Sequence, residues 1–68
     1  MYEFYNAGSR CIVLDGRGES ALIARVDNKQ MPFVVVGVLC RETQDWYHGQ
    51  YFDTITKAME YWNKLNAA

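Results

Sequence analysis

The chain has 68 residues, of which 50% are hydrophobic and 15% aromatic, and this composition is typical of a folded domain. The length predicts one domain, residues 1–68, with no room for a separate catalytic domain or a large enclosed cofactor pocket. Seven Lys and Arg against eight Asp and Glu give a net charge of −1. The sequence therefore lacks a basic surface for phosphate binding and is too weakly acidic to imitate DNA.

Strand and turn signals alternate through the first part of the chain. Residues 2–5 alternate weakly and are rich in aromatic side chains, so they predict an edge strand, followed by a turn at 6–9. Residues 10–14 predict a second strand. The two glycines in residues 15–18 predict a hairpin connection, and residues 20–27 predict a third strand.

The segment after the turn at residues 28–31 and Pro32 is the only long run that is apolar at both odd and even positions. Four valines and a glycine favour a strand over a buried helix, and we expect a central strand over residues 33–40. Alternation places its side chains on two faces, with Phe33, Val35, Gly37 and Leu39 on one and Val34, Val36, Val38 and Cys40 on the other. Both faces then need a cover, and the second cover is a second copy, a curled sheet or another protein.

The C-terminal third predicts one more strand and a helix. After a polar turn at residues 42–45, the final strand, residues 46–52, would place Trp46, His48, Gln50 and Phe52 on one face and Tyr47, Gly49 and Tyr51 on the other. Gly49 indicates a bulge or a close approach by another backbone. Asp53 is the expected N-cap of a helix from Thr54 to about Leu65, with an apolar stripe formed by Ile55, Ala58, Met59, Trp62 and Leu65. The predicted fold is α+β, an antiparallel meander of four to five strands with one C-terminal helix packed on one face.

Candidate catalytic residues are few. Cys11 and Cys40 are the only cysteines and His48 is the only histidine. Either cysteine with His48 and a carboxylate would suit a nucleophilic site, and both cysteines with His48 and one carboxylate would make four metal ligands. The spacing of these residues matches neither pattern. We therefore expect no catalytic residue, no metal and no cofactor. The glycine-rich stretch at residues 15–20 leads into a strand, whereas a phosphate cradle opens a helix.

The cysteines and the hydropathy of the chain also indicate the cellular compartment. The sequence shows no charged-then-apolar leader and no run of 18 apolar residues, so we expect no membrane association. Two cysteines within apolar strand patterns predict reduced thiols that serve as packing groups. We expect a cytoplasmic protein.

Aromatic residues exceed what a small core obviously uses, and such residues are enriched in protein interfaces. We predict a non-catalytic protein-binding module, with a possible homodimer, whose contacts are Trp46, Tyr47, His48 and Tyr51, with Tyr2 and Tyr5 as second choice. One alternative is a module that stacks single-stranded nucleic acid on these aromatics. A second alternative is a small enzyme or ligand sensor built on Cys40 and His48.

The segment Trp46-Tyr47-His48-Gly49-Gln50-Tyr51-Phe52, followed by Ala58, Tyr61 and Trp62, resembles the ending of small proteins from bacteriophages and mobile elements. In those proteins a Trp-x-x-Gly-x-Tyr-Phe stretch leads into a short terminal helix. Some of them are inhibitors of host defence, including anti-CRISPR proteins. The resemblance covers about a third of the chain. It implies a phage-encoded inhibitor that acts in the host cytoplasm by occluding a site on a host defence complex or enzyme.

Overall fold

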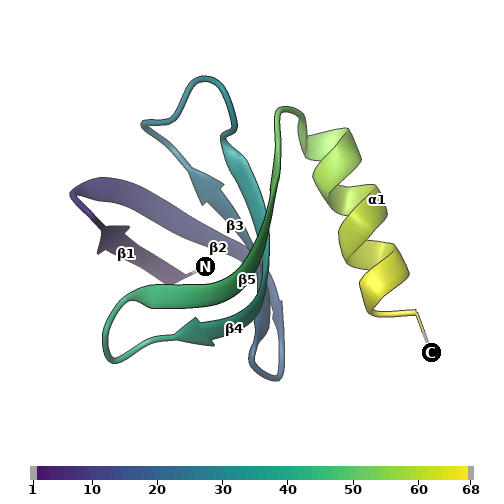
Figure 1. Ribbon diagram of the computed structural model, residues 1–68, viewed down its shortest axis with the longest axis horizontal. Coiled ribbons are helices and arrows are strands. Elements are labelled where there is room, and N and C mark those ends of the chain that lie inside the picture. The colour runs from purple at the N-terminus through teal and green to yellow at the C-terminus, as the bar shows by residue number, and fades with distance from the viewer. Residues whose placement is uncertain (1, 68) are drawn as a thin grey trace.

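The computed structural model describes residues 2–67, which form a five-stranded antiparallel meander followed by one helix (Figure 1). The strand order in the sheet is β1-β2-β3-β4-β5. The α+β meander predicted from the sequence is confirmed. The elements are β1 (Tyr2–Asn6), β2 (Ser9–Arg17), β3 (Ser20–Arg25), β4 (Phe33–Cys40), β5 (Asp45–Phe52) and α1 (Ile55–Leu65).

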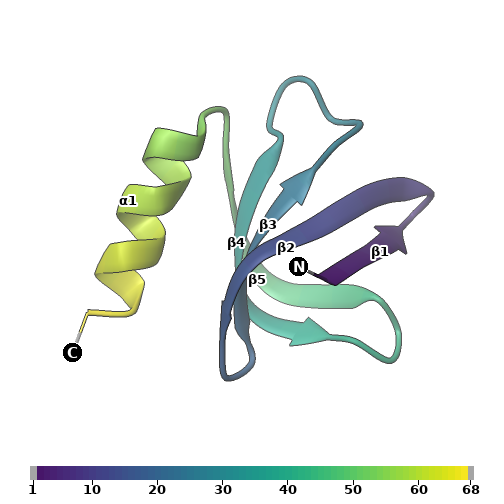
Figure 2. The same cartoon turned by 180° about the vertical axis from the view of Figure 1, so that it is seen from behind.

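The sheet curls so that β1 and the tip of the β4–β5 hairpin approach each other on the side away from α1 (Figures 1 and 2). The curled side encloses an inner core, formed by Phe4, Cys11, Val13, Ala21, Ile23, Val34, Val36 and Leu39. The outer side carries a helix-side core, formed by Leu22, Val35, Ala58 and Trp62. Over residues 34–36, both faces of β4 are therefore covered by the chain itself, by α1 on one side and by the curled sheet on the other.

A kink at Gly37 and His48 breaks the predicted alternation of β4 and β5. β4 and β5 pair residue by residue from Phe33↔Phe52 to Cys40↔Asp45, except that Gly37 and His48, which would face each other, are not paired. His48 has a φ of 59°, and a Cβ on Gly37 would lie 3.2 Å from the His48 Cβ. A larger residue at position 37 would therefore need the His48 side chain to shift.

Two sequence expectations fail at this kink. Leu39 was expected on the face opposite to Val34 and Val36, but it packs with them in the inner core. Trp46 and Tyr51 were expected on opposite faces of β5, but the Trp46 indole donates a hydrogen bond to the Tyr51 hydroxyl. The reason is that Gly37 in β4 and His48 in β5 interrupt the regular pleat. After each of them, side chains that would have pointed to one face of the sheet point to the other.

A bulge at Leu14 in β2 places the next residue, Asp15, in contact with α1. The register shifts between Val13↔Ile23 and Asp15↔Leu22, which leaves Leu14 unpaired. Asp15 consequently shares the helix side with Leu22, and its Oδ2 accepts a hydrogen bond of 3.0 Å from the Trp62 indole. Trp62 is buried, so the bulge supplies the acceptor that its N–H needs.

Several predicted boundaries were wrong by a few residues. The second strand continues to Arg17, and the hairpin turns at residues 18–19, where Gly18 has a φ of 59°. The third strand ends at Arg25 instead of residue 27, because the Asn28 side chain accepts hydrogen bonds from two backbone N–H groups of the following loop.

The helix cap also differs from the prediction. Thr54, not Asp53, is the N-cap, and its hydroxyl accepts from the Lys57 backbone N–H at 3.3 Å. Asp53 instead forms an ion pair of 3.1 Å with the Lys57 ammonium. Of the predicted apolar stripe of α1, Ala58 and Trp62 are buried, while Ile55, Met59 and Leu65 remain 39–48% exposed.

Replacing Asp15 with Ala should lower the free energy of unfolding by about 1–2 kcal/mol, because the buried indole N–H of Trp62 loses its acceptor. Asp15→Asn keeps an amide oxygen and should lose less. Urea denaturation measures both. Equal stability of the Ala variant and the parent would show that this bond does not hold α1 on the sheet.

The turn of the β1–β2 hairpin holds an alanine in an unfavourable backbone conformation. Ala7 and Gly8 have φ values of 51° and 83°, as a type I′ turn requires, and alanine is poorly suited to the first position. Ala7→Asn should stabilise the fold by about 1 kcal/mol and raise Tm by roughly 4–8 °C. The matched control Ala67→Asn changes an exposed alanine outside the sheet and should leave Tm nearly unchanged. A lower Tm for Ala7→Asn would contradict the turn assignment.

Candidate functional site

Four aromatic side chains cross the opening between β1 and β5, and we call them the aromatic seam: Tyr2, Phe4, Trp46 and Tyr51. The Tyr2 and Phe4 rings stack with centroids 5.6 Å apart, and Phe4 meets Trp46 edge to face at 6.3 Å. Trp46 Nε1 donates to the Tyr51 hydroxyl at 3.0 Å. In the described part of the chain, no backbone ladder joins β1 to β5, and the seam closes the inner core there.

An arginine lies at each end of the seam. The Arg25 guanidinium carbon is 4.6 Å from the centre of the Tyr51 ring, and that of Arg41 is 4.9 Å from the centre of the Tyr2 ring. Each contact of this kind contributes about 0.5–1 kcal/mol at an exposed site. Arg25 also donates to the backbone carbonyl oxygen of Met31, which fixes its position.

Gly49 makes the seam possible on the β5 side. A Cβ at this position would lie 3.2 Å from Trp46 Nε1 and 3.3 Å from the Tyr51 ring. The close approach at this glycine therefore comes from two side chains of its own strand, and not from the other backbone expected from the sequence.

The six predicted contact residues divide into two groups. Tyr2 and Trp46 are half-buried members of the seam, and Tyr51 joins them while remaining 44% exposed. Tyr47 points to the opposite face of β5 and is 59% exposed, and His48 is exposed at the kink. Tyr5 lies on β1, the other edge strand, and is 58% exposed. The structure thus brings together Tyr2, Trp46 and Tyr51, and leaves Tyr47, His48 and Tyr5 free on the surface.

A shallow depression of about 470 Å³ lies beside Tyr47. Its walls are Gly18 and Glu19 of the β2–β3 turn, residues 38–42, and Tyr47 itself. The Leu39 backbone N–H donates to the Glu19 carbonyl oxygen at 2.7 Å, which holds the turn against β4. Sequence reasoning missed Glu19, Val38 and Glu42 because three segments that are distant in sequence meet here, and no local pattern announces such a meeting.

The cysteines and the histidine are not arranged as a catalytic group. Cys40 pairs with Asp45, whereas His48 lies in β5 between the partners of Val36 and Val38, at the level of Gly37, three residues before Cys40. Hydrogen bonds from the side chain and backbone of Thr43 lower the pKa of the Cys40 thiol. Cys11 is buried in the inner core, and this burial raises the pKa of its thiol. Both thiols are free, and within residues 2–67 no group of His, Cys, Asp and Glu side chains could hold a metal ion.

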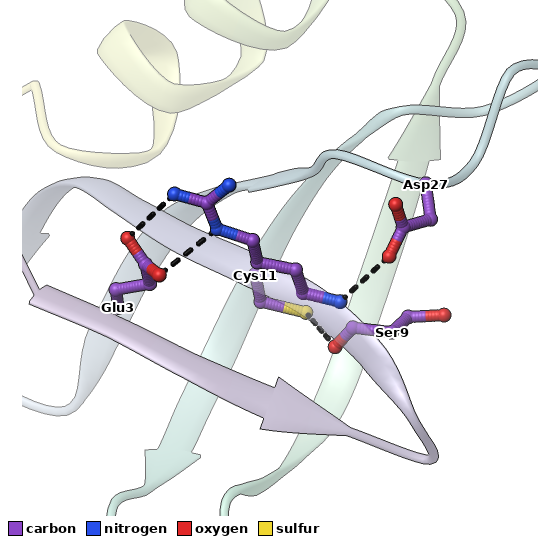
Figure 3. A network of polar contacts seen from close by, with 5 residues as sticks. Glu3, Ser9, Cys11 and Asp27 are labelled. Carbon is purple, nitrogen blue, oxygen red and sulfur yellow. Dashed lines mark hydrogen bonds and ion pairs between the residues drawn. The ribbon is translucent and has the colours of Figure 1, made fainter.

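A polar network near the start of β2 joins three segments (Figure 3). Arg10 binds Glu3 through two hydrogen bonds of 2.9 and 3.0 Å, and its backbone N–H donates to Asp27 Oδ2 at 3.1 Å. The Arg10 guanidinium lowers the pKa of the Glu3 carboxyl. The Cys11 thiol donates to the Ser9 carbonyl oxygen at 3.6 Å. These contacts tie β1, β2 and the loop after β3 together, so the network is structural.

Comparison with protein-family models, with curated proteins and with solved structures finds no match to this chain. The helix described in residues 2–67 is too short and too polar to cross a membrane.

Trp46→Ala should lower the free energy of unfolding by about 2–3 kcal/mol, because it removes a ring that packs against Phe4 and seals the inner core. Tyr47→Ala, at the next position, should change it by less than about 0.5 kcal/mol. Chemical denaturation of both variants makes the comparison. A Trp46→Ala variant as stable as the parent would remove the structural role assigned to the seam.

Proposed function

We propose that the chain is a non-catalytic protein-binding module that contacts its partner along the edge strand β5. The observation that carries this proposal is the free edge itself. Among the strands of residues 2–67, β5 pairs only with β4, and its exposed aromatic side chains lie on both faces of the strand. Tyr47 is 59% exposed on the outer face and Tyr51 is 44% exposed on the inner face.

An unpaired edge offers backbone donors and acceptors to an incoming extended segment, and the side chains on either face supply selectivity. Rigid aromatic anchors lose little conformational entropy on binding and often dominate the binding energy of an interface. The kink at His48 bends the edge, which limits pairing between copies of the same chain. The same edge therefore suits a selected partner better than indiscriminate aggregation.

The role we propose is inhibition by occlusion. A rigid domain of 7.9 kDa that adds itself to a strand or surface of a larger protein would cover a site there without performing chemistry. The resemblance to small phage proteins implies a host defence complex or enzyme as the partner. Two free thiols fit the reducing cytoplasm in which such a partner would be met.

Single-stranded nucleic acid is the alternative partner. Arg25 and Arg41 beside the rings of the aromatic seam favour it, because arginine and aromatic side chains together stack and neutralise nucleotides. The net charge of −1 opposes it. Salt dependence separates the two, since phosphate contacts weaken steeply with added salt.

The experiment uses the immobilised chain to capture partners from nuclease-treated host lysate. A partner bound by the parent should be retained by Tyr5→Ala and weakened about tenfold or more by Tyr47→Ala. The two tyrosines are matched controls, because they are 58% and 59% exposed on opposite edge strands. Equal losses in the two variants, or none, would contradict β5 as the binding edge. Binding that appears only in a parallel lysate without nuclease, and that collapses with added salt, would favour the alternative.

A further inference from the structure

We propose that the depression beside Tyr47 is an anchor site for a basic side chain of the protein partner, an arginine or a lysine. This inference rests on the proposed function and deepens it, because Tyr47 belongs both to the β5 edge and to the wall of the depression. A segment bound along β5 would therefore pass beside the depression and would be able to place a side chain in it.

The lining of the depression suits the aliphatic stem of a long basic side chain. Val38 is half-buried and contributes apolar surface, and the exposed Tyr47 ring is also part of the lining. Lysine and arginine bury their methylene groups on such surface while the charged head stays near water. The Tyr47 ring also offers a π face to that head.

Negative charges in the lining of the depression favour a cationic ligand. Glu19 and Glu42 both line the depression, and within residues 2–67 no ion pair engages either carboxylate. Arg41 also lines it, but the Arg41 guanidinium lies over the Tyr2 ring. A Cβ at Gly16 would be 3.9 Å from Arg41 Nη2, which places that group against β2. Two unpaired carboxylates therefore remain to meet the charge of a partner.

Glu19 is held in place by the backbone. The hydrogen bond from the Leu39 N–H to the Glu19 carbonyl oxygen fixes the turn against β4, and the Ser20 hydroxyl donates to the Gly37 carbonyl oxygen at 3.0 Å. A carboxylate on a fixed turn loses less freedom on binding than one on a loose loop. The depression is thus prepared before a partner arrives.

The test titrates the ¹⁵N-labelled chain with N-acetyl-arginine methylamide, and the neutral isostere N-acetyl-citrulline methylamide is the comparison. The amides of Glu19, Tyr47 and residues 38–42 should shift in a saturable way with the arginine probe. The citrulline probe should bind about fivefold or more weakly, because it lacks the charge. The double variant Glu19→Gln/Glu42→Gln should lose a similar factor, whereas Glu60→Gln, on the exposed side of α1, should bind as the parent does.

Three results would overturn the inference: no saturable shift up to about 50 mM probe, equal binding of arginine and citrulline, or equal binding by the double variant. The captured partner gives an independent readout. If the double variant retains the partner fully while Tyr47→Ala loses it, the basic anchor is wrong and the proposed β5 interface stands. If Tyr47→Ala also retains the partner, the proposed function fails.

Discussion

The apolar character of both faces of β4 is the constraint on which the rest of the structure depends. Val34, Val35 and Val36 are all at most 1% exposed, although they point alternately to opposite sides of the sheet. One short helix covers only one side, so the sheet has to cover the other by curling. The kink at Gly37 and His48 permits the curl, and the aromatic seam closes what it leaves open. An 11-residue helix and five short strands thereby form two cores.

The need to close the inner core also separates the aromatic residues into those that pack and those that stay exposed. Some of the aromatic side chains that exceed the needs of a small core pack in the aromatic seam, where Phe4 is buried and Trp46 is half-buried. On the two edge strands, the exposed aromatic residues are Tyr47 and Tyr51 on opposite faces of β5, and Tyr5 on β1. Tyr61 is also exposed, on α1. A side chain that packs against the inner core, Trp46, and an exposed one, Tyr47, therefore occupy neighbouring positions of β5. Variants of this strand need a stability measurement before any loss of binding is interpreted.

Local patterns predicted the elements well, and long-range geometry was predicted poorly. The doubly apolar run gave β4 correctly, and the periodicity after Thr54 gave α1, because both signals lie within a few residues. The face exchange at Gly37 and His48 was missed, since a positive φ at a histidine has no sequence signature. The bulge at Leu14 was missed for a related reason: Asp15 changes sides to meet Trp62, a partner 47 residues away. The depression at Tyr47 likewise joins segments that no local pattern connects.

Native-state hydrogen exchange of β4, measured across protein concentration together with light scattering, tests the central claim most directly. If α1 and the curled sheet cover β4 within one chain, the amides of Val34, Val35 and Val36 should be strongly protected at a solution mass of 7.9 kDa. That protection should not depend on concentration. Protection that appears only as the mass doubles would show that a second copy covers the inner face, and would contradict the account.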